Sequence, residues 1–271
     1  MLTLIQWIVF LVYALTTFFY WYDFITEKNG FEKKGFYTFA IAVLSHLGLL
    51  VYFIYDIGRL PIATVSEALG TFVWITASLY FLLELRWKER SHGVLILSVI
   101  LILLGNSNLT FNISTEINPI LYDVKFEIHV FAMLLGYSGF ALSFIASILH
   151  LILAREIQKK EQGLFYRRLP SLAYFERISA AAINVGLLFT GIGFVLGYYF
   201  AAQVWNFKIY TDPKIIMVIV TWLIYFVHFI GRRMGKIRGQ RAALISVIGF
   251  CLILFSFLII STLVPGAHQF G

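Results

Sequence analysis

Residues 204–229 read VWNFKIYTDPKIIMVIVTWLIYFVHF, which is a tryptophan, a polar turn at 211–214, and then an apolar run that contains His228. The run is long enough for a helix that crosses a hydrocarbon core of roughly 30 Å. Runs of this kind recur along the whole chain of 271 residues, of which 60% are hydrophobic and 13% are charged. The sequence therefore predicts an all-α, polytopic membrane protein that lies in the lipid bilayer.

Charged and turn residues divide the apolar sequence into eight predicted transmembrane helices. They cover residues 2–22, 36–57, 66–85, 93–106, 125–154, 176–203, 214–231 and 242–264. The fourth ends in polar residues at 106–108, so we expect a short helix that its neighbours shield. No positively charged region precedes the first run, which favours a transmembrane helix over a cleaved signal peptide. We expect the eight helices to form a single integral membrane domain over residues 1–271.

The distribution of positive charge predicts the orientation of this eight-helix bundle. If the N-terminus lies outside, 17 of the 21 Lys and Arg residues fall in inner loops, and only Arg59, Lys125, Lys208 and Lys214 lie outside. Short loops that are rich in Lys and Arg stay in the cytoplasm. Both termini are therefore predicted on the outer side of a cell (plasma) membrane. The net charge of +7 reflects this topology, and we expect no nucleic-acid partner.

Motifs for enzymatic chemistry are missing from the sequence. It contains no Cys-x-x-Cys-His haem attachment site, no His-Glu-x-x-His zinc motif and no phosphate-binding glycine loop. The loops are also too short to fold as soluble domains. We assign no catalytic residue and favour binding, transport or regulation over bond making.

The six histidines sort by their predicted depth in the membrane. His129 and His268 lie at the outer surface, and the others are His46 and His228 inside the bilayer, His150 near the inner end of its helix and His92 at the inner boundary. Polar side chains inside a membrane tend to be functional, and neutral imidazole is a common ligand of haem iron. The alternatives are a hydrogen bond to a neighbouring helix for the inner histidines and a solvated position for the outer ones.

The spacing of the histidines disfavours a cytochrome b arrangement with two stacked haems. Only the fifth predicted helix contains two histidines, His129 and His150. At 1.5 Å per residue they are separated by about 31 Å, the full thickness of the membrane.

The stretch quoted first resembles the tryptophan-rich signature of the cytochrome c assembly and haem-handling membrane proteins, the family of CcsA, CcmC and HemX. That signature reads roughly W-G-x-x-W-x-W-D-P-K-E and precedes a helix with T-W-L-I-Y. Trp205 matches the first Trp, residues 212–214 match D-P-K, and residues 221–225 match T-W-L-I-Y without a gap. Four positions depart from the signature: Asn206, Ile209, Thr211 and Ile215.

Other landmarks of the family follow in the same order along the chain. Pro61 and Glu67 resemble its P-x-x-N-x-Y-E segment, with Thr64 and Ser66 at the Asn and Tyr positions. His129 resembles the outer histidine before the signature. His228 and His268 resemble the histidine that ends the next helix and the one in a G-x-H-x-x-G ending.

The resemblance implies that the chain binds b-type haem without a covalent bond. It implies outer axial ligands at His129 and His268, and an inner ligand at His228. By its predicted depth alone, His46 is a candidate partner of His228, and His150 is the rival candidate. It also implies residues that cover or pack against the haem, namely Trp205, Asp212, Pro213, Trp222, Pro61 and Glu67. Arg59 is a candidate to pair with a haem propionate, and the alternative for it is a solvated loop charge.

The thinned signature and the chain length favour the HemX-type branch of the family. The resemblance then implies haem trafficking or feedback on tetrapyrrole synthesis, with a membrane or cytosolic partner. Two alternatives remain open. One is a haem lyase or exporter component of cytochrome c biogenesis, and the other is a transporter of protons or another solute through His46 and His228.

Overall fold

The computed structural model describes residues 1–26, 31–112, 119–160, 162–204 and 213–256, and the side chains of these residues except 200–204, 213 and 214. All regular secondary structure in these ranges is helical. The chain forms two compact units. Unit 1 contains Met1–Ile117 and Arg168–Pro170, and unit 2 contains Asn118–Arg167 and Ser171–Gly271.

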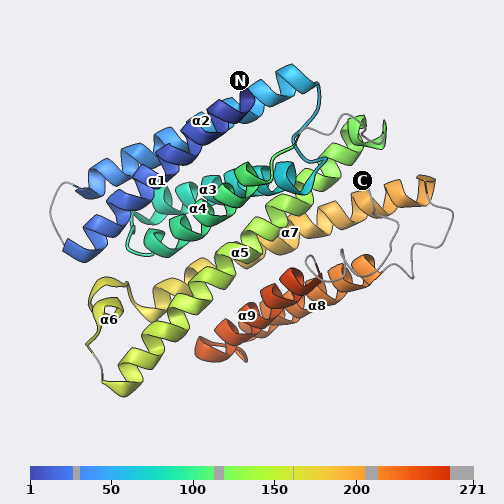
Figure 1. Ribbon diagram of the computed structural model, residues 1–271. Helices are drawn as coiled ribbons and strands as arrows, with labels where there is room; N and C mark the ends of the chain where they lie inside the picture. Colours follow the sequence, from blue (N-terminus) through green and yellow to red (C-terminus); the bar gives the residue numbers. More distant parts are fainter. Residues whose placement is uncertain (27–30, 113–118, 161, 205–212, 257–271) are drawn as a thin grey trace. The chain divides into compact units, whose positions relative to one another are not determined.

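Unit 1 is built from four long helices among its described residues. They are α1 (Leu2–Thr26), α2 (Phe31–Ile57), α3 (Val65–Trp87) and α4 (Gly93–Leu109). The first helix packs against α2 and α4, and α3 packs against α4 (Figure 1). The ring of Tyr20 fixes this packing, because a Cβ added at Gly35 of α2 or at Gly93 of α4 would lie only 3.0 Å or 2.6 Å from it.

Unit 2 begins with the 3-10 turn η1 (Pro119–Tyr122) and the long helix α5 (Val124–Lys159). A short helix, α6 (Leu164–Arg168), precedes α7 (Leu172–Val204), α8 (Pro213–Arg233) and α9 (Gly239–Phe255). Figure 1 shows α5 lying along α7 and α8 lying beside α9.

Glycines let α5 and α7 approach to backbone contact. A Cβ added at Gly139 of α5 would lie 2.7 Å from the carbonyl oxygen of Ala182 and 2.7 Å from the amide nitrogen of Gly186, both on α7. Small residues at helix interfaces allow such close approach in membranes. Gly186 of the predicted sixth span therefore serves helix packing.

Local capping defines where several helices begin and end. The Thr64 side chain accepts a hydrogen bond from the Glu67 amide at the start of α3, and Asp123 caps α5 in the same way through Lys125. Both helices end at a lysine in the left-handed region, Lys88 (φ 55°) and Lys160 (φ 57°). These positions close the last turn by hydrogen bonds from their own amides.

Six of the described helices are long and apolar enough to cross a membrane, and two shorter apolar helices, α4 and α9, have 17 residues each. Exposed large apolar side chains are frequent on them, for example Leu4, Leu44 and Ile102. A surface of this kind requires a lipid environment. The chain is thus an all-helical, multi-pass membrane protein.

Helices occur at all eight predicted positions, but their ends differ from the prediction. The fifth continues from the predicted end at 154 to Lys159, because polar and basic residues continue the helix beyond the apolar segment. The fourth extends from 106 to Leu109, and its buried Ser107 and Asn108 confirm that its neighbours shield it. The predicted eighth span, 242–264, extends past the last described residue.

Candidate functional site

His129 lies in the second turn of α5 and faces α7. Its Nδ1 atom is 2.7 Å from the carbonyl oxygen of Gly193. Because a carbonyl can only accept, Nδ1 carries the proton, and Nε2 is the basic nitrogen of the neutral ring. This is the arrangement in which metal-ligating histidines are usually held, with one ring nitrogen bonded to the backbone and the other directed at the metal.

Gly197 forms the surface on which the His129 ring rests. A Cβ added at Gly197 would lie 2.7 Å from Nδ1 of His129, so only glycine leaves room for the ring in this orientation. The neighbouring Gly193 supplies the acceptor carbonyl. One helix turn of α7 therefore fixes both the position and the tautomer of this half-buried histidine.

His228 lies fully buried in α8 and contacts α9. Its Nε2 atom is 3.0 Å from the carbonyl oxygen of Ala242, so Nε2 donates the hydrogen bond. Nδ1 is then the basic nitrogen, and it has no hydrogen-bond partner among the described residues. Nε2 thus makes the helix-to-helix hydrogen bond that the simpler alternative predicts. Nδ1 is a buried basic nitrogen that could bind a metal ion.

His150 lies in the C-terminal third of α5, in the same unit as His228. Its Nδ1 is 3.3 Å from the carbonyl oxygen of Leu172, and its side chain borders a cavity of about 10 Å³ together with Glu176 and Arg232. A volume of this size holds about one water molecule. It cannot hold a porphyrin ring.

His46 is buried in α2 within unit 1. Its ring contacts the ring of Tyr13 edge-on, with centroids 5.8 Å apart, and its Nδ1 has no hydrogen-bond partner among the described residues. The Tyr13 hydroxyl is likewise buried and unpartnered there. Buried polar atoms without partners are uncommon in folded proteins, and a ligand or water at the site is one explanation for them.

Pro61 and Glu67 hold the connection between α2 and α3. The Glu67 carboxylate accepts two hydrogen bonds from Arg59, at 2.6 and 3.0 Å, and a third from the Ala63 amide at 2.9 Å. The carbonyl of Pro61 accepts a hydrogen bond of 2.6 Å from Thr71. The two charged side chains are completely buried. Arg59 is therefore not a solvated loop charge, and its guanidinium pairs with Glu67.

The tryptophan-rich stretch lies only partly within the described residues. Trp205, Asp212 and His268 fall outside them, and Pro213 begins α8. Trp222 of α8 donates to the Leu187 carbonyl of α7 at 3.2 Å and stacks on Phe226. Its indole therefore connects α7 to α8.

The family model of the cytochrome C assembly protein matches residues 62–268, which is most of the chain. The match includes the whole of α8 and the seat of His129, which consists of Gly193 and Gly197. The chain belongs to the cytochrome c assembly protein family.

Curated members of the cytochrome c assembly family align with nearly the whole chain. Protein HemX of Bacillus subtilis (strain 168) is 24% identical over 93% of this chain and 92% of its own length. The cytochrome c biogenesis protein CcsA of Chlorella vulgaris is also 24% identical, over 97% of this chain and 94% of its own. CcsA of Chlamydomonas reinhardtii is 27% identical over 79% of this chain and 62% of its own. Similarity to both kinds of member leaves both functions open.

The donor chemistry of the described histidines fits the haem expected in a cytochrome c assembly protein. His129, His228 and His46 each present an imidazole, and at His228 and His46 a buried ring nitrogen has no hydrogen-bond partner among the described residues. Neutral imidazole nitrogen is a standard axial ligand of haem iron. His46 belongs to unit 1, whereas His129, His150 and His228 belong to unit 2.

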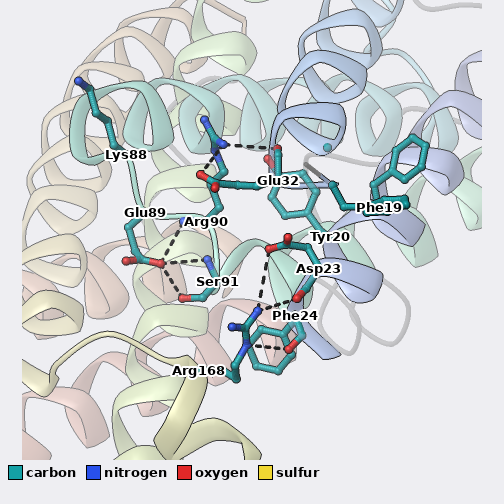
Figure 2. A pocket seen from close by; sticks show the side chains of 12 residues that line it. Phe19, Tyr20, Asp23, Phe24, Glu32, Lys88, Glu89, Arg90, Ser91 and Arg168 are labelled. Carbon is teal, nitrogen blue, oxygen red and sulfur yellow. Dashed lines mark hydrogen bonds and ion pairs between the residues drawn. The ribbon is translucent and has the colours of Figure 1, made fainter. Parts of the chain in front are cut away.

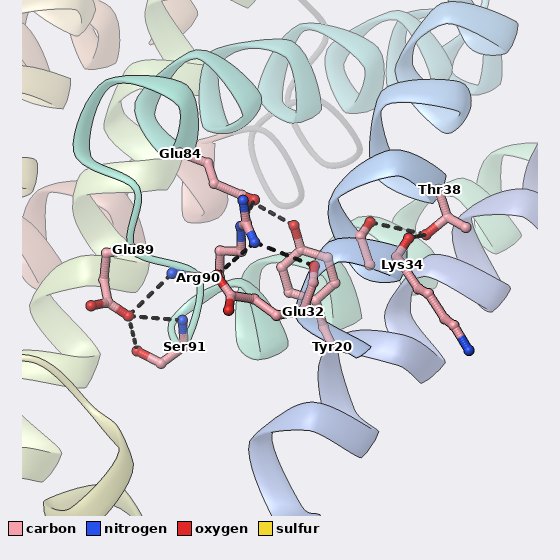
Figure 3. Close-up of polar contacts among 9 residues, drawn as sticks. Tyr20, Glu32, Lys34, Thr38, Glu84, Glu89, Arg90 and Ser91 are labelled. Carbon is pink, nitrogen blue, oxygen red and sulfur yellow. Dashed lines mark hydrogen bonds and ion pairs between the residues drawn. The ribbon is translucent and has the colours of Figure 1, made fainter. Parts of the chain in front are cut away.

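A buried cluster in unit 1 of this assembly-family chain is not among the sites that the sequence predicts. Glu84 of α3 accepts hydrogen bonds from Tyr20 of α1 (2.7 Å) and from Nε of Arg90 (2.9 Å), and Arg90 also pairs with Glu32 of α2 at 2.6 Å (Figure 3). The available signal was Glu84 itself, a carboxylate inside the predicted span 66–85. From the sequence alone, Arg90 is one of the basic loop residues that predict topology.

Proposed function

We propose that the chain is a haem-binding membrane protein of the HemX type, which holds b-type haem through histidines for haem trafficking or for feedback on tetrapyrrole synthesis. The two units would act as one haem-handling domain over residues 1–271. When bound, haem supplies an iron whose two axial positions accept imidazole nitrogen. The protein's part is to orient those nitrogens, and no bond making is required of it.

The observation that carries this proposal is the seat of His129. The Gly193 carbonyl sets the tautomer and Gly197 provides the space, so that Nε2 is the basic nitrogen of an oriented ring. A solvated histidine would need neither feature. In the proposed outer site His268 is the second axial ligand, and Trp205 packs against the ring.

In the proposed inner site His228 supplies one ligand and His46 or His150 the other. Support for His228 and His46 comes from their buried Nδ1 atoms, which lack hydrogen-bond partners among the described residues. His150 faces the Leu172 carbonyl and a cavity of water size.

The test is an absorbance spectrum of the purified protein, oxidised and then reduced, with a pyridine haemochrome count of haem per polypeptide. We expect a bis-histidine b-type spectrum, loss of one haem in His129→Ala, and loss or a shift of the other in His228→Ala. A colourless protein that takes up no added haem would contradict haem binding and favour the solute transporter.

A glycine pair on α7 provides a matched control that leaves every histidine in place. Gly197→Ala places a methyl group against the His129 ring, whereas a Cβ at Gly191 meets only Trp222 at an ordinary 3.6 Å. We expect Gly197→Ala to lower outer-site haem affinity about tenfold, equivalent to 1.4 kcal/mol, and Gly191→Ala to leave it unchanged. Equal haem affinities in the two variants would show that the space at Gly197 does not matter for haem binding by His129.

The alternative is a haem lyase or exporter component of cytochrome c biogenesis, since CcsA proteins are also similar to this chain. The departures from the tryptophan signature at Ile209 and Thr211 favour the HemX-type function over the lyase. Expression in a strain that lacks its own cytochrome c biogenesis system separates the two functions. Covalent haem on a Cys-x-x-Cys-His apocytochrome would establish the lyase.

A further inference from the structure

A cavity of about 270 Å³ lies at one end of unit 1, and no histidine is among its lining residues (Figure 2). The last turns of α1, the first turn of α2 and the connection between α3 and α4 enclose it. Its apolar wall includes Phe19, Phe24 and Phe31. The volume is far larger than a single water requires, so it can accept a small polar group with part of an apolar chain.

The charged residues around the cavity balance in number. Three are acidic and three are basic: Asp23, Glu32, Glu89, Lys88, Arg90 and Arg168. A cavity with both signs of charge and no net excess suits a zwitterion better than a simple anion or cation. Glu89 is occupied locally, because its carboxylate accepts from the backbone and side chain of Ser91.

Arg90 provides a preorganised anion-binding group on one side of the cavity. Its Nε is fixed by the fully buried carboxylate of Glu84, and its guanidinium lies 4.8 Å from the centre of the Phe36 ring. Its Nη1 pairs with Glu32, whose side chain is 55% exposed, and Nη2 has no hydrogen-bond partner among the described residues. An exposed ion pair contributes about 0–1 kcal/mol. An incoming oxyanion can therefore replace Glu32 while Glu84 keeps the guanidinium in place.

Asp23 offers the opposite charge elsewhere in the same cavity. Arg168 donates to the carbonyl oxygens of Asp23 and Phe24 at 2.6 and 2.7 Å, but its Nη2 is 4.0 Å from the Asp23 carboxylate. Figure 2 shows this pair apart from the pair of Arg90 and Glu32. The Asp23 carboxylate is thus only loosely paired with Arg168, which makes it a suitable place for an ammonium group.

The cavity lies where one long apolar helix ends and the next begins, which in a membrane protein is where helices leave the hydrocarbon. It is lined by the end of α1 and the beginning of α2, both of which are long and apolar enough to span a membrane. On α1 the neighbouring Phe18 and Ile25 are 56% and 59% exposed, as expected for side chains that contact lipid. Tyr and Trp gather at the headgroup level of a bilayer, and this end of α1 contains Tyr20, Trp21 and Tyr22.

We propose that this cavity binds a zwitterionic phospholipid headgroup of the phosphoethanolamine type. The phosphate takes the Nη atoms of Arg90 and displaces the Glu32 carboxylate, and the primary ammonium donates to Asp23. The acyl chains continue along the lipid-exposed face of α1. Free phosphoethanolamine has the same polar chemistry without the chains.

The test is native mass spectrometry of the full chain in detergent with equal amounts of phosphatidylethanolamine, phosphatidylcholine and phosphatidylglycerol, and in a parallel sample with soluble phosphoethanolamine. We expect selective retention of one phosphatidylethanolamine, because phosphatidylcholine has no ammonium proton to donate and phosphatidylglycerol has no ammonium. Asp23→Asn should weaken this retention about tenfold through loss of a charge-assisted hydrogen bond.

Glu32→Gln gives an outcome that misfolding cannot imitate. It removes the competing carboxylate and leaves the cavity with an excess of positive charge, so the preference should shift toward phosphatidylglycerol. Asp56→Asn, an exposed change at the other end of α2, is the control and should behave like the unmodified chain. Equal retention of all three lipids, or no shift in Glu32→Gln, would overturn the proposal. If the chain binds soluble phosphoethanolamine but retains none of the three phospholipids, the assignment to a lipid is wrong.

Discussion

Burial controls the protonation of His92, which precedes α4 in unit 1. The side chain is 2% exposed and packs edge-on against Tyr80, with ring centroids 5.3 Å apart. Removal from water disfavours the charged ring and lowers the pKa of His92 from 6.5 to about 3. At neutral pH this histidine is therefore neutral, and it differs in kind from an interfacial histidine that titrates freely.

We predict that this residue makes the folded protein sensitive to mild acid. Between pH 6.5 and 3 the unfolded chain binds a proton at His92 and the folded chain does not, so stability is present above pH 6.5 and falls as the pH decreases. The slope is about 1.4 kcal/mol per pH unit for one such group. Thermal unfolding in detergent between pH 7.5 and 5 measures it.

His92→Gln removes the titrating group while keeping a polar side chain at the position. Its unfolding midpoint should therefore depend less on pH than that of the unmodified chain. An identical pH slope in the two proteins would show that other groups cause the acid sensitivity.

At the scale of elements, close approach of α5 and α7 determines the packing of unit 2. The methyl group in Gly139→Ala would collide with the backbone of Ala182 and Gly186, which cannot rotate away. We predict destabilisation of about 1–3 kcal/mol, the usual cost of overpacking, measured as a lower unfolding midpoint.

Gly48→Ala in α2 is the control for this prediction. A Cβ at Gly48 meets nothing within 4 Å, so alanine should be neutral or should stabilise the helix by up to about 1 kcal/mol. Equal destabilisation by both substitutions would show that glycine is needed for a reason other than helix packing.

The elements were largely predictable because each depends on a local apolar run, whereas their polar contacts depend on distant partners. Hydropathy places α4, but Ser107 and Asn108 extend it because they bond to the carbonyls of Ser66 and Gln6. The ion pair of Arg59 and Glu67 follows a left-handed Gly58 (φ 81°) that ends the helical period. Neither the spacing of these residues nor their composition reveals such contacts.

For the candidate site, the sequence likewise predicts the histidines but not the residues that position them. The motif identified His129 and His228, because its residue types are tied to fixed positions in the chain. It could not identify Gly193 and Gly197 as the seat of His129, since they lie more than 60 residues away on another helix. Glu84 and Arg90 were visible as charges, but only the fold brings Tyr20 and Glu32 to them.

At the scale of the whole molecule, the proposed eight spans and outer termini predict which loops face outward. After Cys251→Ser removes the single cysteine, new cysteines are introduced at exposed positions and labelled with a membrane-impermeant maleimide on intact cells. We expect labelling at Asp56→Cys and Tyr122→Cys, and at Lys33→Cys, Arg86→Cys and Lys236→Cys only after permeabilisation.

The comparison of positions 86 and 122 decides whether α4 crosses the membrane. The helix has 17 residues and lies between them, so its rise is about 26 Å at 1.5 Å per residue. Labelling of both positions from one side would mean that α4 does not span, and the proposed count of eight would then be wrong.

The contacts of Arg168 have a consequence for the order in which the chain can mature during synthesis. The last turn of α1 has carbonyl groups without partners in the helix, and those of Asp23 and Phe24 are satisfied by Arg168. Residues 168–170 belong to unit 1, although about 50 residues of unit 2 precede them. The ribosome therefore finishes α5 before unit 1 can be completed, and a nascent chain arrested before residue 168 would expose an uncapped end of α1 to quality control.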